Sequence, residues 1–428
     1  MTAAHLPIQR PRQAKLLVVD KRGHFRNWPR SRLVDLFHPG DLVIANDAAT
    51  LPASLSGVHL RSGDVIEVRL AGRRSLAADG IRHSIAVVFG AGDFRIRTED
   101  RQPPPEFKTG DQLALGPLRA TVEGILSHPR LVQLVFDGSP NEIWEGLARH
   151  GRPIQYSHVR TPLALWDVWT PIAGPPVAFE PPSAGFALDW NTVGSLTERG
   201  AKFATITQAA GVSSTGAPDL DALLPFDEPY YIPPSTALAI RNAQARDGRV
   251  VAVGTTVVRT LEDAAALDGS VRSGEGVAAL RIGRSSHLHV VDAILSGAHE
   301  PGTSHHELLG AFVDDETLSR IDRELDLREY RTHEFGDSVF LEHLENDASS
   351  LERELNAVEA RKATNMITSP STQNSQHLYR IDIFKVPPSA RDQFLTRVRE
   401  THGFLSTLPG FVRHSIFEQS SVPAPSTL

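Results

Sequence analysis

The segment Arg249-Val-Val-Ala-Val-Gly-Thr-Thr-Val-Val-Arg-Thr-Leu-Glu262 is the most informative stretch of this sequence. Its apolar, β-branched beginning predicts a buried strand, and Gly254 then lets the backbone approach a ligand closely. Thr255 and Thr256 open a predicted helix whose N–H groups and dipole favour an anion or a carboxylate, with Arg259 one turn further on. The glycine pattern of nucleotide-binding loops is missing, so a nucleotide phosphate site is not predicted. The alternative interpretation is an ordinary strand–turn–helix unit with a threonine cap.

Strand and helix signals around this unit predict an α/β main domain that is interrupted by a small β-barrel. In the main domain, strands are expected at 15–20, 42–45 and 249–253, and helices at 31–37 (with Ser31 as N-cap), 193–199, 235–245, 257–266 and 316–325. Short alternating segments predict barrel strands at 65–70, 85–89, 94–97, 118–122 and 131–136. The expected boundaries are 1–54 and 151–344 for the main domain, 55–150 for the barrel, 345–376 for a helix and flexible linker, and 377–428 for a partial α+β tail.

The composition excludes several classes of function. The 428 residues include no cysteine, which excludes disulfides, thiolate metal sites and a cysteine nucleophile. A formal net charge of −7 excludes an overall basic surface of the kind that coats a nucleic acid. Because no uninterrupted apolar run reaches about 18 residues, no membrane span is predicted, and a soluble cytoplasmic protein is expected.

Several further blocks follow one another in a recognisable order. They are Lys15–Asp20, Pro39–Asp47, Pro182–Gly185, Glu228 with Tyr230, the segment 249–262, Val291-Asp292 with His299, Pro301 and Ser304, and Tyr330–Asp337. Over about residues 15–342, this ordered set resembles the S-adenosylmethionine:tRNA ribosyltransferase-isomerase family of queuosine biosynthesis. Agreement of several blocks in order is far more specific than any single block.

The resemblance implies a reaction and a set of site residues. Family members move the ribosyl part of S-adenosylmethionine onto a 7-deazaguanine base in tRNA, which gives epoxyqueuosine and releases adenine and methionine. By position in the blocks, it implies catalytic roles for His299, Asp337 and Glu228. It implies contacts with S-adenosylmethionine, the co-substrate, for Asn46, Asp47, Ser183, Gly185, Gly254, Thr255, Thr256, Arg259 and Asp292. His299 is the favoured acid–base group, because histidine titrates near neutrality.

Four of these residues also have structural interpretations. His299 would then be a loop histidine bonded to backbone, and Asp337 would cap a turn. Asp47 would form an Asx-turn, and Glu228, next to a proline, would be a solvated loop charge. These alternatives remain open at the level of the sequence.

The sequence departs from the family at polar positions. Family arginines are replaced by Ala49 and Ser54, and family histidines by Ala187 and Phe226. Two alternatives follow: the same fold and cofactor with a small-molecule acceptor, or a non-catalytic RNA-binding or scaffold relative.

Positive charge in the predicted barrel makes tRNA a candidate partner. Residues 69–101 hold seven arginines against four acids, and phosphate contacts are predicted for Arg69, Arg73, Arg74, Arg95 and Arg97. The alternative is that these arginines lie on solvated strand faces.

No metal is expected. His287 and His289 would share one face of a strand, and His305 and His306 follow downstream, but no motif supplies the remaining ligands.

The C-terminal segment predicts strand, helix and strand at Tyr379–Phe384, Ala390–Leu405 and Phe411–Phe417. It resembles half of an antibiotic-biosynthesis-monooxygenase-like, ferredoxin-like domain. Because half a domain leaves an open sheet edge, dimerisation is one way to complete it. No catalytic role is assigned to it.

Overall fold

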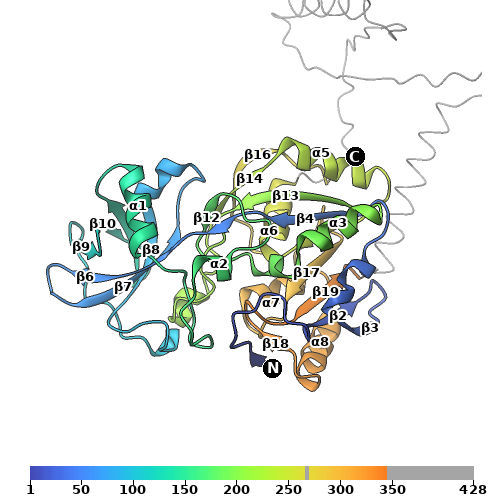
Figure 1. Ribbon diagram of the computed structural model, residues 1–428, viewed down its shortest axis with the longest axis horizontal. Coiled ribbons are helices and arrows are strands. Elements are labelled where there is room, and N and C mark those ends of the chain that lie inside the picture. The colour runs from blue at the N-terminus through green and yellow to red at the C-terminus, as the bar shows by residue number, and fades with distance from the viewer. Residues whose placement is uncertain (266–268, 345–428) are drawn as a thin grey trace, which may run out of the picture. The chain divides into compact units, whose positions relative to one another are not determined.

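The computed structural model describes residues 1–265 and 269–344, and in these ranges it shows an α/β domain with an inserted β-barrel, as predicted (Figure 1). The predicted linker at 345–376 and the partial ferredoxin-like tail at 377–428 lie outside the described residues. Among the described helices, none has the length and apolar character needed to cross a membrane.

A mixed sheet forms the centre of the main domain. In spatial order its strands are β16 (Gly274–Ala278), β14 (Glu228–Ile232), β13 (Lys202–Gln208), β4 (Leu42–Asn46), β15 (Val250–Val253), β17 (Ala293–Gly297), β19 (Ser338–Glu342), β2 (Lys15–Val19) and β3 (Phe25–Pro29). The four central strands β13, β4, β15 and β17 are parallel. Their carboxyl ends therefore meet at one edge of the sheet, which is where ligands bind in many open α/β sheets.

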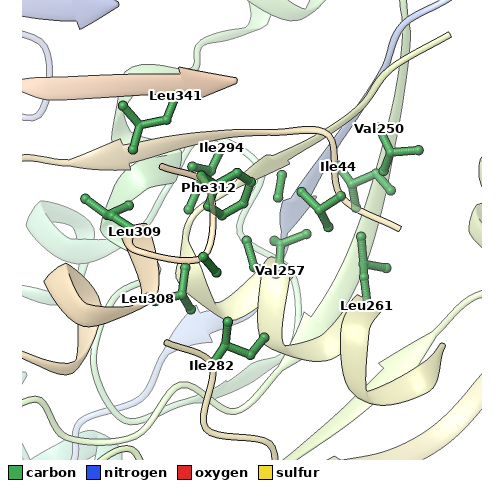
Figure 2. Packing of buried hydrophobic residues seen from close by; sticks show 14 of the residues in the cluster. Ile44, Val250, Val257, Leu261, Ile282, Ile294, Leu308, Leu309, Phe312 and Leu341 are labelled. Atoms are coloured by element: carbon green, nitrogen blue, oxygen red, sulfur yellow. The ribbon is translucent and has the colours of Figure 1, made fainter. Parts of the chain in front are cut away.

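Alternation of side chains along the strands builds a core on each face of the sheet. Val250 and Ala252 of β15 belong to one core, and Val251 and Val253 belong to the other. The first core is covered by α5 (Pro234–Gln244), α6 (Thr255–Ala264), α7 (Ser304–Leu309) and α8 (Asp315–Leu327). The second is covered by the 3₁₀ helices η1 (Arg30–Leu36) and η4 (Ser183–Ala187) and by α3 (Trp190–Glu198). Figure 2 shows Val257 and Leu261 of α6 packed against the first face.

The inserted barrel is closed and antiparallel. Its strands are β6 (Ser54–His59), β7 (Val65–Gly72), β8 (His83–Phe89), β9 (Gln112–Leu115), β10 (Leu118–Ile125) and β11 (Leu131–Phe136). They close in the order β10-β11-β8-β7-β6-β9. Helix α1 (Pro140–His150) packs on the barrel and begins with a capping box between Ser139 and Glu142. Short 3₁₀ turns, η2 (Ala78–Arg82) and η3 (Thr98–Asp100), lie in its connections.

Short elements complete the described fold. They are the parallel pairs β1 (Thr2–Ala3) with β18 (Arg331–Thr332) and β5 (Ala49–Thr50) with β12 (Pro176–Ala178), and the one-turn helices α2 (Leu165–Val168) and α4 (Pro218–Asp221).

Two local predictions are wrong. Residues 94–97 form turns rather than a strand, because the carboxylate and carbonyl of Asp93 accept the N–H groups of Arg95 and Ile96. The helix expected at 31–37 is a 3₁₀ helix that begins at Arg30, with Pro29 rather than Ser31 at its N-cap. Helix α6 begins at Thr255, directly after Gly254, as the segment 249–262 predicts and two residues before the start of the range 257–266.

Candidate functional site

A cavity of about 510 Å³ lies at the edge where the central parallel strands end. This volume falls in the usual range for small-molecule sites. Gly254 directly follows β15, and Gly297 is the last residue of β17. Both glycines line the cavity. Of the predicted site residues, the cavity brings together Ser183, Glu228, Gly254, Thr255, Thr256, Arg259 and His299.

The start of α6 forms one wall of this cavity. Gly254 has φ +95°, a conformation that favours glycine, and its N–H donates to Leu295 O at 2.8 Å. The N-cap residue is this glycine, so no side chain caps α6, and the predicted threonine cap does not form. The buried hydroxyl of Thr256 has no hydrogen-bond partner within the described part of the chain. The helix N-terminus therefore presents N–H groups and a hydroxyl that suit a carboxylate.

A buried ion pair joins Glu228 and Arg259 below this wall. Glu228 also accepts hydrogen bonds from Gln208 Nε2 at 2.9 Å and from Gly211 N. Arg259 donates further to the backbone carbonyls of residues 226, 278 and 280. Burial raises the pKa of Glu228, and the guanidinium of Arg259 opposes this shift. The interpretation of Glu228 as a solvated loop charge is therefore wrong, since its carboxylate is buried and fully bonded.

Glu180 is an acid in the cavity wall that sequence reasoning missed. Its side chain is buried and accepts hydrogen bonds from Tyr156 Oη and, at 3.1 Å, from Ser213 N. Burial raises the pKa of Glu180 to about 7. A group that titrates near neutral pH inside a cavity is a candidate acid–base catalyst. In the sequence, the one feature that could have marked Glu180 as a site residue is its position just before the block 182–185.

Two stacked imidazoles also line the cavity. His299 and His305 have ring centroids 4.7 Å apart, and His299 Nε2 lies 3.1 Å from Ser296 Oγ. Burial lowers the pKa of His299 well below its usual value and that of His305 to about 4. Both rings are therefore neutral at pH 7, and the expectation that His299 titrates near neutrality is wrong, because burial disfavours its protonated form. His299 contacts a hydroxyl rather than the backbone, which differs from its structural interpretation.

Asn46, Asp47 and Gly185 do not line the cavity. Asn46 links β4 to β13, because its amide exchanges hydrogen bonds with the backbone N–H and C=O of Gln208 at 3.0 Å each. The carboxylate of Asp47 accepts the hydroxyls of Thr205 at 2.9 Å and Thr207 at 2.6 Å, so the predicted Asx-turn is not what holds it.

At Gly185 an added Cβ would lie 3.0 Å from the side chain of Thr170, a tight contact that favours glycine there. Asn46, Asp47 and Gly185 thus contribute hydrogen bonds and packing outside the cavity lining.

Asp292 and Asp337 also lie outside the cavity lining. Asp292 precedes β17, and its carboxylate accepts Val250 N at 2.8 Å, where β15 begins. That is the amino end of the parallel strands, about 13 Å from the cavity edge for a four-residue strand. Asp337 accepts the backbone N–H groups of Lys15 at 2.7 Å and Arg331 at 2.8 Å, which is the capping role considered above.

Two of the five barrel arginines that were predicted to contact tRNA are buried. Arg69 is 1% exposed and Arg73 is 4% exposed, so the prediction that they contact tRNA phosphates is wrong. Arg69 is paired with the buried Glu67, with Nε 2.8 Å from the carboxylate.

Arg74 is exposed, and so are Arg95 and Arg97, which pair with acidic neighbours two residues away along the chain. Arg97 also lines the cavity.

The predicted histidine pair does not lie on a strand. Residues 287–289 have no strand conformation, although the rings of His287 and His289 lie 5.1 Å apart. Both side chains are exposed and away from the cavity lining.

Together, these features define an α/β protein with an inserted β-barrel and a ligand cavity at the carboxyl edge of its parallel strands. The sequence model of the family described as "Queuosine biosynthesis protein" matches residues 1–341. The chain belongs to this family, which confirms the resemblance seen in the sequence.

Curated relatives carry the name S-adenosylmethionine:tRNA ribosyltransferase-isomerase. One from Geobacter metallireducens is 29% identical and covers 79% of this chain and 95% of the relative. One from Ralstonia nicotianae is 30% identical and covers 76% and 87%, respectively. A crystal structure of the S-adenosylmethionine tRNA ribosyltransferase from Thermotoga maritima is 23% identical over 79% of this chain and 95% of that one, with a TM-score of 0.41.

Proposed function

We propose that the cavity binds S-adenosylmethionine and that the protein transfers the ribosyl part of this co-substrate to a 7-deazaguanine base in tRNA. The names of the curated relatives support the reaction class. The observation that carries the proposal is the pairing of an acidic cavity with an uncapped helix N-terminus. S-adenosylmethionine needs both, because it carries a cationic sulfonium and an anionic carboxylate.

The charges of the lining suit the sulfonium. Five glutamates line the cavity against two arginines, and both arginines are paired, Arg259 with Glu228 and Arg97 with Glu99. Glu300 and Glu334 remain as carboxylates beside the acid Glu180. An excess of carboxylates in a partly desolvated site stabilises a cation strongly. The methionine carboxylate would then lie at the start of α6, near Thr255 and Thr256, where backbone N–H groups and the helix dipole favour negative charge.

The reaction requires one proton acceptor and one proton donor. A proton leaves the carbon beside the sulfonium, and adenine departs with the electrons of its bond to the ribosyl carbon and takes up a proton. The amine of the deazaguanine base forms the new bond to the ribosyl carbon and loses a proton. Methionine leaves with the C–S electrons as the epoxide closes. Neutral His299 is available as the base. Glu180, with a pKa of about 7, is available to protonate the departing adenine. Glu228 accepts hydrogen bonds from three donors, Gln208, Gly211 and Arg259. Its role is to hold these cavity-lining segments in place rather than to exchange a proton.

The test is detection of adenine and methionine by mass spectrometry after incubation with S-adenosylmethionine and tRNA that carries the 7-aminomethyl-7-deazaguanine base. Calorimetry with S-adenosylmethionine measures binding separately. His299→Ala is expected to slow adenine release by about 10²- to 10⁴-fold while leaving the binding heat in place. No binding heat at millimolar ligand would contradict the proposal.

A second candidate keeps the fold and co-substrate but uses a small-molecule acceptor. The burial of Arg69 and Arg73 favours it, because two predicted phosphate contacts are lost. A panel of small amines and deazaguanines, incubated beside the tRNA, separates the two candidates. Robust epoxyqueuosine formation on tRNA would eliminate the second, and adenine release with any acceptor would eliminate a non-catalytic role.

A further inference from the structure

We propose that His158, His333 and Glu334 form a binding site for one zinc ion or a related first-row divalent ion. The three side chains come from two segments far apart in the chain: His158 follows α1, and the other two lie between β18 and β19. One potential ligand atom from each residue lies within 4.8 Å of the other two. All three residues line the cavity described above.

The contacts within the cluster hold the donor atoms together. His158 Nε2 lies 2.9 Å from Glu334 Oε2. The rings of His158 and His333 are stacked, with centroids 4.3 Å apart and an interplanar angle of 16°. The ring of His158 is also nearly parallel to that of Tyr156, with centroids 6.3 Å apart and an interplanar angle of 11°. An entering ion would replace the hydrogen bond between His158 and Glu334, and the stacked rings would have to tilt so that one nitrogen of each imidazole points at the same ion.

The donor types select the class of ion. Two imidazole nitrogens and one carboxylate oxygen suit zinc and other first-row divalent ions, whereas magnesium and calcium prefer oxygen ligands alone. Three protein ligands leave at least one position open in a zinc site of the catalytic kind. Because all three residues line the cavity, that open position is accessible to a cavity ligand.

The backbone and the surroundings of His333 add an independent reason. His333 has φ +67°, a left-handed conformation that is uncommon outside glycine and that concentrates at functional sites. The turn is closed by Gly336 N, which donates to His333 O at 2.9 Å. Glu300 Oε1 lies 3.6 Å from His333 Nε2, where it can orient the ring. Among residues 1–265 and 269–344, this is the one group of at least three such side chains with this spacing.

The experiment is a calorimetric titration of chelator-treated, full-length protein with Zn²⁺, repeated with Co²⁺ while visible absorption is recorded. One equivalent of each ion is expected to bind, with the absorption bands of cobalt in low coordination. His158→Ala, His333→Ala and Glu334→Gln are each expected to weaken Zn²⁺ binding by at least about tenfold. Glu334→Gln keeps its size and a hydrogen-bond acceptor for His158, so this variant remains informative if an alanine variant fails to fold.

The matched control is the double variant His287→Ala, His289→Ala, which removes two exposed, adjacent rings elsewhere on the surface. It is expected to bind Zn²⁺ as the wild type does. The proposal is overturned if the wild type binds no zinc, or if the cluster variants bind as tightly as the control. S-adenosylmethionine binding is measured on the same samples, so loss of the zinc site and failure of the proposed function are separate results.

Discussion

Replacement of Glu180 by glutamine is expected to reverse a pH-dependent loss of stability. Glu180 is buried, and its pKa is raised to about 7 from an ordinary value of 4.5. Between these two values, the folded protein binds more protons at this site than the unfolded chain does. Stability contributed by the protonated acid is therefore fully present below about 4.5 and is lost as the pH rises through about 7.

The size of the effect follows from the same two values. The interval between 4.5 and about 7 corresponds to about 3 kcal/mol at pH 8, because one pKa unit equals about 1.4 kcal/mol. Glutamine keeps the acceptor for Tyr156 Oη but does not titrate. The difference in unfolding free energy between Glu180→Gln and the wild type should thus change by about 3 kcal/mol in favour of the variant from pH 4.5 to pH 8.

The assay is urea unfolding followed by circular dichroism at half-unit steps from pH 4.5 to 8. Glu198→Gln, at an exposed position in the last turn of α3, is the matched control and should show a much smaller change over this range. Tyr156→Phe removes a hydrogen bond that stabilises the carboxylate, so it should move the transition of Glu180 to higher pH. A stability difference for Glu180→Gln that stays constant within about 0.5 kcal/mol would refute the assignment of this titration.

Three further substitutions probe the scaffold of the site by urea unfolding, with S-adenosylmethionine calorimetry as a second readout. Arg259→Met leaves the buried carboxylate of Glu228 without its cation and should cost about 3–5 kcal/mol; a loss below about 1 kcal/mol would contradict the buried ion pair. Gly254→Ala places a side chain at φ +95° and should cost about 1–2 kcal/mol and weaken ligand binding; an unchanged dissociation constant would argue against a ligand at this turn. Glu262→Ala removes the acceptor of three backbone N–H groups at residues 289–291 and should cost about 1–3 kcal/mol at least, with little effect on ligand affinity per folded molecule; the reverse pattern would contradict a purely structural role.

Local sequence signals predicted the scaffold well where neighbouring residues decide the conformation. The run at 249–253 alternates side chains between two cores, and it forms the buried strand β15 over residues 250–253. The glycine at 254 predicted the turn at which the backbone takes a positive φ and α6 begins. The predicted strand at 94–97 failed, because an aspartate side chain satisfies backbone groups locally and the alternation there has no core to face.

The candidate site was predicted only in part, because position in a sequence block does not say which way a side chain faces. The residues near 254–259 and His299 line the cavity, since they follow the ends of parallel strands. Asp292 belongs to a matching block but precedes its strand, which places it at the opposite edge of the sheet. The sequence predicted that Arg69 and Arg73 belong to a basic surface, but the closed barrel and the adjoining segments bury both side chains.

The sequence by itself determined the class of fold, the family, the absence of thiol chemistry and the strand–turn–helix unit that forms one wall of the cavity. Only the tertiary structure decided which charged groups meet. Glu180 contacts Tyr156 across 24 residues of chain, and His158 contacts Glu334 across 176. Propensity and periodicity act over a few residues, whereas convergence and burial depend on how distant segments pack. Burial and neighbouring charges set the pKa of an acid, and packing decides which metal-ligating side chains meet. The chemistry of this site therefore emerges only in the folded chain.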